Sequence, residues 1–218
     1  MKKIKKTAVF LLSVLLIFIP YMSCFSVEMT PVEKLNTLGI LIGPETGITD
    51  EYLSKPATRI DAAIIVLKLK GLIFDAENSE GSENFVDSDQ ALSEYSRKIM
   101  GYLKMNPEAG FIGYLDRFDP NSVITDQMFF KVLLTLLGYS QGSDFQWSET
   151  IVMAMLAGMK EIAGIKELTI EDLSVAIVEA LDSEIKNTGM LFIEKLVIDG
   201  VISIESAREA GWDYIVIE

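Results

Sequence analysis

The chain has 218 residues, with 19 basic and 32 acidic side chains, no histidine and one cysteine, and half of its residues are hydrophobic. This is enough for one large domain or a few small repeats around a buried core. The missing histidine and the single cysteine exclude a Ser-His-Asp triad, a Cys-His dyad, a histidine-containing zinc site and an intrachain disulfide. The formal net charge of −13 disfavours nucleic-acid binding, which needs a basic face.

The first 26 residues have the pattern of a secretory signal peptide. Lysines at the start precede an almost unbroken apolar run, residues 8–20, which is too short to span a bilayer comfortably. Cleavage after Ser26 would leave 15 basic and 32 acidic residues, because the removed segment contains four lysines and no acid. The mature balance is then −17. Two alternatives remain: an uncleaved anchor on the outer face of the membrane, and a lipid-modified Cys24.

Helix-start signals dominate the first part of the mature chain. Thr30 is followed by proline and, three residues on, by Glu33, a capping box that predicts a helix ended by Gly39. Thr58 repeats the device ahead of an apolar run that stops at Gly71. The apolar residues of this second helix are nearly continuous, so we expect it to be buried on most sides.

The same arrangement returns twice downstream. Residues 90–104 place apolar side chains at three- and four-residue spacing, which predicts one apolar helix face. Thr125 then caps a helix that stops at Gly138, with the same 13-residue spacing from threonine to glycine as in the first unit. A third, shorter helix pair is expected over 147–159 and 169–181. Equal spacing in successive units is what an internal repeat predicts.

The remaining segments complete an all-α prediction. Residues 75–84 are acidic, with serine, glycine and asparagine, and predict a linker. The tail predicts a fourth helical pair over 190–198 and 203–210. Residues 214–217 fit either a terminal strand or an apolar plug, and nothing in the sequence indicates a sizeable sheet.

One loop has a more specific spacing. Residues 113–125, from Gly113-Tyr114 through Phe118, Pro120 and Ile124-Thr125, resemble the signature between the two helices of an S-layer homology (SLH) repeat. Phe85-Val86-Asp87 resembles the Phe-x-Asp opening of that repeat. In the first unit, residues 38–43 resemble the leucine-glycine turn of the family, and residues 58–61 stand where the family has Thr-Arg-Ala-Glu. The resemblance covers about residues 30–183 and is weaker in the third unit.

The resemblance implies an all-α architecture in which three helix-loop-helix SLH-like repeats form a pseudo-threefold bundle. The helical pair predicted for the tail adds a C-terminal helical hairpin. No constellation of nucleophile, base and orienting group appears in the sequence, so we expect no enzymatic activity and no cofactor. The expected segments are a signal peptide (1–26), a first repeat (27–76), a second repeat (77–142), a divergent third repeat (143–186) and a helical tail (187–218).

The resemblance further implies an exported protein, at the cell wall or cell surface, that binds a secondary cell-wall polysaccharide noncovalently. The family's main polymer-facing residue is the arginine of Thr-Arg, whose guanidinium suits carboxylate or ketal oxygens on a sugar. Asp126 and Ile170 stand at that position in the other units, so at most one groove keeps the cation. The expected polymer-binding residues are Arg59, Thr58, Gly43, Lys55 and Tyr114, with Lys34 nearby.

The sequence also allows a different function. The repeats could form a protein-protein interaction or scaffold module, contacting a partner through tail residues such as Phe192, Leu196 and Trp212. Arg59 would then be a solvated residue beside Asp61, because exposed pairs of this kind are common and weak.

Other candidate sites have simpler interpretations. Asp87 and Asp89 begin like a calcium loop, but the third ligand, the glycine and the closing glutamate are missing, so no metal site is expected. Asp116 and Asp119 form a possible carboxylate pair, yet the loop motif accounts for them structurally. The methionines between 153 and 159 are adaptable apolar residues that we expect in the core. No catalytic residue is assigned.

Overall fold

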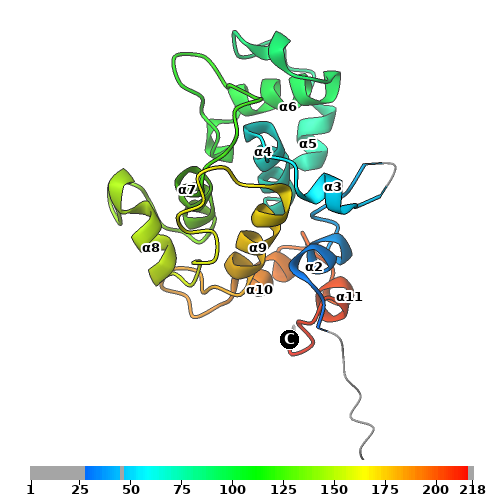
Figure 1. Cartoon of the computed structure of the whole chain (residues 1–218), viewed down its shortest axis with the longest axis vertical. Coiled ribbons are helices and arrows are strands. Elements are labelled where there is room, and N and C mark those ends of the chain that lie inside the picture. Colours follow the sequence, from blue (N-terminus) through cyan, green and yellow to red (C-terminus); the bar gives the residue numbers. More distant parts are fainter. Residues whose placement is uncertain (1–27, 45–46, 216–218) are drawn as a thin grey trace, which may run out of the picture.

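The computed structural model describes residues 28–44 and 47–215, and within these ranges every regular element is a helix (Figure 1). The all-α prediction is therefore confirmed for this part of the chain. The predicted signal peptide lies outside the described residues, as does the second half of segment 214–217. None of the helices among the described residues is long and apolar enough to cross a membrane.

The α-helices, in chain order, are α2 (Pro31–Thr37), α3 (Asp50–Leu53), α4 (Arg59–Leu69), α5 (Ile73–Asn78), α6 (Glu94–Met105), α7 (Asp126–Leu136), α8 (Thr150–Leu156), α9 (Ile170–Leu181), α10 (Phe192–Ile198) and α11 (Ile204–Glu209). Short 3-10 helices are η1 (Ser88–Gln90), η2 (Pro107–Ala109) and η3 (Trp147–Glu149).

The capping threonines are where the sequence predicts them. Thr30, Thr58 and Thr169 each accept the N–H of an acidic residue three positions on, and that carboxylate in turn accepts the threonine N–H. Thr125 also caps its helix, but the third residue there is Met128, so the reciprocal bond is absent. These caps satisfy N–H groups that a helix start otherwise leaves unpaired.

Two predictions about the second unit are wrong. The first residues of the predicted linker, 75–78, belong to α5, whose Ala76 is fully buried and which packs against α4 and α6. The predicted helix over 90–104 begins only at Glu94, because Ser93 is its cap. Leu92, expected on the apolar face of that helix, precedes it and is 90% exposed.

A closed ring of three backbone hydrogen bonds joins the starts of α4, α7 and α9. The N–H of Ala57 donates to the carbonyl of Leu168 at 2.7 Å, Leu168 donates to Ile124 at 3.1 Å, and Ile124 donates back to Ala57 at 2.9 Å. Each of these residues directly precedes a capping threonine, and all three are buried. The ring therefore satisfies buried peptide groups that no helix or sheet pairs.

A second set of bonds surrounds the ring. The first helical N–H of each of the three helices donates to the extended segment ahead of another: Arg59 to Ser122 at 2.8 Å, Asp126 to Ile165 at 3.3 Å, and Ile170 to Lys55 at 3.1 Å. These bonds fix the position of each helix start relative to its neighbours.

The other helices pack around this centre. Helix α2 packs on α9, α8 on α7, and α6 on α5 and α4 (Figure 1). The two helices predicted for the tail are present, with α10 against α9 and α11 against α2. One continuous core of buried apolar side chains runs through all of them.

The tail is part of this core. Phe192, Leu196 and Trp212 are only 2–3% exposed, so the expectation that they contact a partner is wrong. The Trp212 indole N–H donates to Asp182 at 2.7 Å, and the Lys34 ammonium lies 5.0 Å from the centroid of the Trp212 ring. Lys34 therefore belongs to the contact between α2 and the tail.

Because Trp212 is buried, Trp212→Ala should lower the free energy of unfolding by about 3–5 kcal/mol, as large-to-small core changes do. Trp147→Ala is the matched control: its side chain is 44% exposed, and we expect a loss below about 1 kcal/mol. Urea unfolding followed by circular dichroism measures both. Equal losses in the two variants would contradict the assignment of the tail to the core.

Candidate functional site

A groove with two cationic side chains lies between the start of α4, the loop after η2, α7 and η3. We call it the cationic groove, and its volume is about 170 Å³. Its lining residues are Arg59, Gly110, Phe111, Ile112, Ile124, Met128, Lys131, Val132 and Trp147. It is therefore built by segments that lie far apart in the sequence and meet at the ring.

Arg59 forms the α4 side of the cationic groove. Its guanidinium carbon lies 5.8 Å from the centroid of the Phe111 ring and 5.1 Å from that of Phe118. Its Nε is buried and has no hydrogen-bond partner among the described residues. Burial lowers the pKa of Arg59, although the charges of Asp119 and Asp87 oppose this. The guanidinium is thus a charged donor that is only partly satisfied.

Lys131 faces Arg59 from α7. Burial lowers the pKa of Lys131, and the charge of Arg59 lowers it further. Within residues 28–44 and 47–215, neither side chain lies within 4.0 Å of a carboxylate oxygen. Two partly desolvated like charges repel each other, so an anion placed between them would stabilise both.

Of the other expected site residues, none lines the cationic groove. The Thr58 hydroxyl is engaged by Asp61, at 2.5 Å. Lys55 is exposed on the segment before the ring, where its carbonyl accepts from the helix start of α9. The described contacts of Thr58 and Lys55 therefore stabilise the starts of α4 and α9.

Gly43 and Tyr114 also lie outside the lining. A Cβ on Gly43 would approach Ile48 Cγ1 to 2.6 Å, so this glycine permits close packing of its own loop. Tyr114 is 78% exposed and pairs with Arg117 through two backbone hydrogen bonds of 2.9 Å, which close a tight turn.

Sequence reasoning missed Lys131 and Trp147. Lys131 is the one lysine of α7, in an otherwise apolar stretch, and that isolated charge is the signal that could have found it. Trp147 was predicted only as the first residue of a helix, because nothing in the sequence indicates that η3 lies beside the start of α4.

The positions that match Arg59 in the other two helices carry no cation. Asp126 is 7% exposed, and its carboxylate accepts the N–H of Gln127 at 2.6 Å and of Gly164 at 2.8 Å. It therefore holds the loop ahead of α9. Ile170 is buried and belongs to the core.

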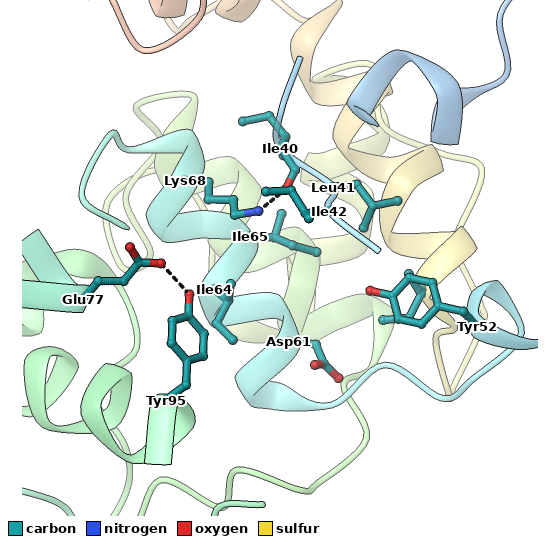
Figure 2. A pocket seen from close by; sticks show the side chains of 11 residues that line it. Ile40, Leu41, Ile42, Tyr52, Asp61, Ile64, Ile65, Lys68, Glu77 and Tyr95 are labelled. Carbon is teal, nitrogen blue, oxygen red and sulfur yellow. Dashed lines mark hydrogen bonds between the residues drawn. The ribbon is translucent and has the colours of Figure 1, made fainter. Parts of the chain in front are cut away.

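A second groove, about 310 Å³ in volume, lies on α4 itself (Figure 2). We call it the isoleucine groove. Its lining residues are Ile40, Leu41, Ile42, Tyr52, Asp61, Ile64, Ile65, Lys68, Glu77, Tyr95 and Ile170. The Lys68 ammonium donates to the carbonyl of Ile40 at 3.1 Å, and the Tyr95 hydroxyl donates to Glu77 at 3.0 Å.

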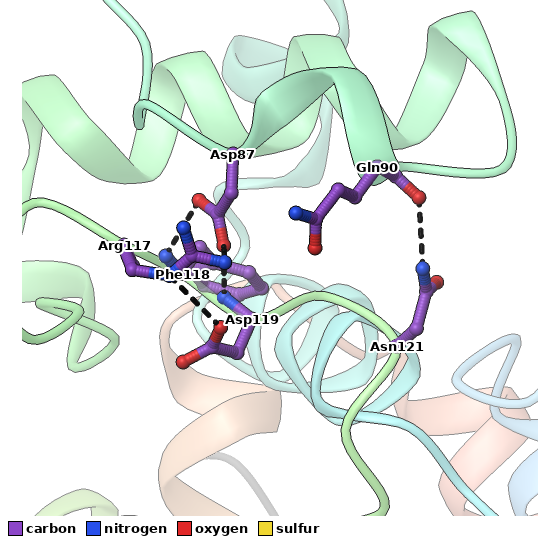
Figure 3. Close-up of polar contacts among 6 residues, drawn as sticks. All are labelled: Asp87, Gln90, Arg117, Phe118, Asp119 and Asn121. Carbon is purple, nitrogen blue, oxygen red and sulfur yellow. Dashed lines mark hydrogen bonds and ion pairs between the residues drawn. The ribbon is translucent and has the colours of Figure 1, made fainter.

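Asp87 locks the loop that carries Phe118. Its buried carboxylate accepts the N–H groups of Phe118 at 2.9 Å and Asp119 at 2.8 Å, with the Arg117 guanidinium 3.7 Å away (Figure 3). Burial alone would raise the pKa of Asp87, but these hydrogen bonds and Arg117 lower it below its usual value. A fourth contact, from the Asn121 amide to the Gln90 carbonyl at 2.8 Å, closes the same loop.

These contacts give Asp87 a structural role, which is to hold the loop that carries Phe118. No group of three or more metal-ligating side chains occurs among the described residues. Asp119 lies 3.4 Å from the Arg117 Nε, and Asp116 pairs with Lys104, so the two carboxylates have separate partners.

No family model and no curated protein matches the sequence. The functional argument therefore rests on the geometry of the cationic groove. Its two cations, its aromatic rings and its partly exposed Trp147 suit a ligand that combines an anionic group with a flat or ring-shaped body.

Asp87→Asn should lower the free energy of unfolding at pH 7 by about 2 kcal/mol, because the amide nitrogen would face an N–H donor. Since the folded pKa of Asp87 is lowered, its stabilisation is present above the pKa of an unfolded aspartate, about 4, and is lost as the pH falls through the folded value. The gap between wild type and variant should therefore shrink in acid. Urea titrations at several pH values measure it, with the exposed Asp89→Asn as control. A gap independent of pH would refute this role.

Proposed function

We propose that this protein is exported and binds noncovalently, through the cationic groove, to an anionic secondary polysaccharide of a bacterial cell wall. The observation that carries the proposal is the pair Arg59 and Lys131, which face each other without a carboxylate partner among the described residues. A carboxylate or ketal on a sugar supplies the missing charge and accepts from the fork of the guanidinium. The neighbouring Trp147, which lines the groove and is partly exposed, stacks on the sugar ring in this proposal.

The proposal includes the repeat architecture. Three SLH-like units, residues 27–76, 77–142 and 143–186, are arranged with pseudo-threefold symmetry about the hydrogen-bonded ring, and residues 187–218 follow as a tail. The ring supports this, because it joins three equivalent helix starts. The packing of α2 on α9, α6 on α4 and α8 on α7 supports it too, since each unit's first helix covers the second helix of another unit.

The overall charge limits how such a ligand is held. A balance of −17 in the mature chain repels a polyanion, but screening at physiological ionic strength confines that repulsion to about 8 Å. Inside the cationic groove the local charge is positive. We therefore expect short-range contacts to a single acidic sugar, rather than attraction along the whole polymer.

A second candidate function, a protein-interaction module, has a specific observation in its favour on α8 rather than on the tail. Val152, Met155 and Leu156 lie on one face of this helix and are 52–77% exposed, so the expectation that Met155 belongs to the core is wrong. The stretch from Thr150 to Met159 contains no charged residue. Exposed apolar side chains that lie together commonly mark a contact surface.

The test of polymer binding is cosedimentation of residues 27–218 with peptidoglycan sacculi, with and without their secondary polymer, at low and moderate salt. We expect binding only to sacculi that carry the polymer. Arg59→Ala and Lys131→Ala should each weaken binding at least about tenfold, the effect of removing one charged hydrogen bond. The exposed Lys55→Ala removes the same charge outside the groove and should leave binding unchanged.

The melting temperature serves as the control for folding, and we expect it to change little in all three variants. Binding that does not need the polymer would contradict the proposal. An equal loss of polymer binding in Lys55→Ala would also contradict it, because binding would then depend on the net charge of the protein and not on the cationic groove. Binding unaffected by any of these changes, but lost when Val152 and Leu156 become serine, would favour the interaction module.

A further inference from the structure

The two grooves occupy equivalent places on two helices, the isoleucine groove on α4 and the cationic groove on α7. Equivalent positions are found by counting from the capping threonine of each helix, Thr58 in α4 and Thr125 in α7. The first residue of a neighbouring helix enters each groove: Arg59 in the cationic groove and Ile170 in the isoleucine groove. The sixth residue after the threonine follows the same rule, with Lys131 on α7 and Ile64 on α4. Both cations of one groove are thus replaced by isoleucine in the other.

Two further positions complete the comparison. The third residue after the threonine is Met128 in the cationic groove and Asp61 in the isoleucine groove. An aromatic side chain closes each groove from a following helix, Trp147 in the first and Tyr95 in the second. The lining of the cationic groove has two basic and no acidic residues, whereas the lining of the isoleucine groove has two acidic and one basic. The sign of the local charge is inverted.

The single cation of the isoleucine groove is already engaged. Lys68 donates to the carbonyl of Ile40, burial lowers its pKa, and the charge of Glu77 opposes this. One oxygen of Asp61 serves the cap of α4, accepting the N–H and hydroxyl of Thr58, and the other accepts no hydrogen bond from a described residue. Asp61 therefore keeps a free acceptor at the rim.

The tyrosines add polar but uncharged groups. Burial and the Glu77 carboxylate raise the pKa of Tyr95 to about 12. Burial, with a contribution from Asp61, raises the pKa of Tyr52 as well. Both phenols are thus neutral at physiological pH, and both line the groove together with Asp61 (Figure 2). Aromatic rings beside a carboxylate attract organic cations.

We propose that the isoleucine groove binds a primary ammonium group carried on an apolar body, as in a lysine side chain or a free arylalkylamine. The aliphatic floor takes the apolar body, and Asp61 accepts from the ammonium at the rim. A volume of about 310 Å³ is sufficient for one such group. This site is separate from the polymer site and does not rest on it.

The probes are phenethylamine and 3-phenylpropionate, which share an aromatic body and differ in charge. Binding to the full chain is followed by the shifts of isoleucine methyl groups in NMR titrations. We expect phenethylamine to shift the methyls of Ile64, Ile65 and Ile170, and 3-phenylpropionate to bind at least about tenfold more weakly, the effect of one opposed charge in a partly desolvated site. A peptide, acetyl-Gly-Phe-Lys-Gly-amide, tests whether a lysine side chain binds better than the free amine.

Ile64→Lys places in this groove the cation that Lys131 supplies in the other, and it should weaken phenethylamine binding about tenfold. Val175→Lys is the matched control, because Val175 is the sixth residue after Thr169 and lines neither groove. We expect no change there. Glu77→Gln keeps an acceptor for Tyr95 and tests the second carboxylate, with a smaller loss expected.

Three results would overturn the proposal. They are the absence of methyl shifts with both phenethylamine and the peptide, equal affinity for 3-phenylpropionate and phenethylamine, and an equal loss of phenethylamine affinity in Ile64→Lys and Val175→Lys. The outcome is independent of polymer binding, because Ile64→Lys leaves every residue of the cationic groove in place. Cosedimentation of the same variant with sacculi shows this directly.

Discussion

The structure depends on the ring that joins Ala57, Ile124 and Leu168. Extended segments cannot be buried unless their peptide groups are paired, and these segments pair with one another instead of forming a sheet. Three helices consequently begin at one point, and the first residues of two of them, Arg59 of α4 and Ile170 of α9, reach the flanks of α7 and α4. Both grooves arise in this way, so their positions are set by main-chain bonds and not by the side chains that line them.

That separation lets the chemistry of each groove vary freely. One groove has Arg59 and Lys131 where the other has Ile170 and Ile64, and the backbone bonds of the ring are made in spite of this difference. The surrounding loops do depend on particular side chains. Asp87 orders the loop that brings Phe118 under the guanidinium of Arg59, so the cation rests on a surface that is itself held by a buried carboxylate.

Much of the local structure follows from the sequence, because a capping threonine and an acid three residues on act within one turn. Helix α5 was not predicted because its acidic residues are typical of a linker. Its contacts with α4 and α6 could not be inferred from the sequence. The ring could not be predicted from residues so far apart. Arg59 was recognised by its motif, whereas Lys131 and Trp147 enter the groove through packing between distant segments.

The contact of Trp212 with Lys34 and Asp182 has a topological consequence. It brings α11, the last helix of the described residues, beside α2, the first (Figure 1). A linker that crosses this contact would join the two ends of the described chain. The order of the elements along the chain is therefore separable from their arrangement in space, and a circular permutant opened in the exposed loop at 80–83 would keep every bond of the ring.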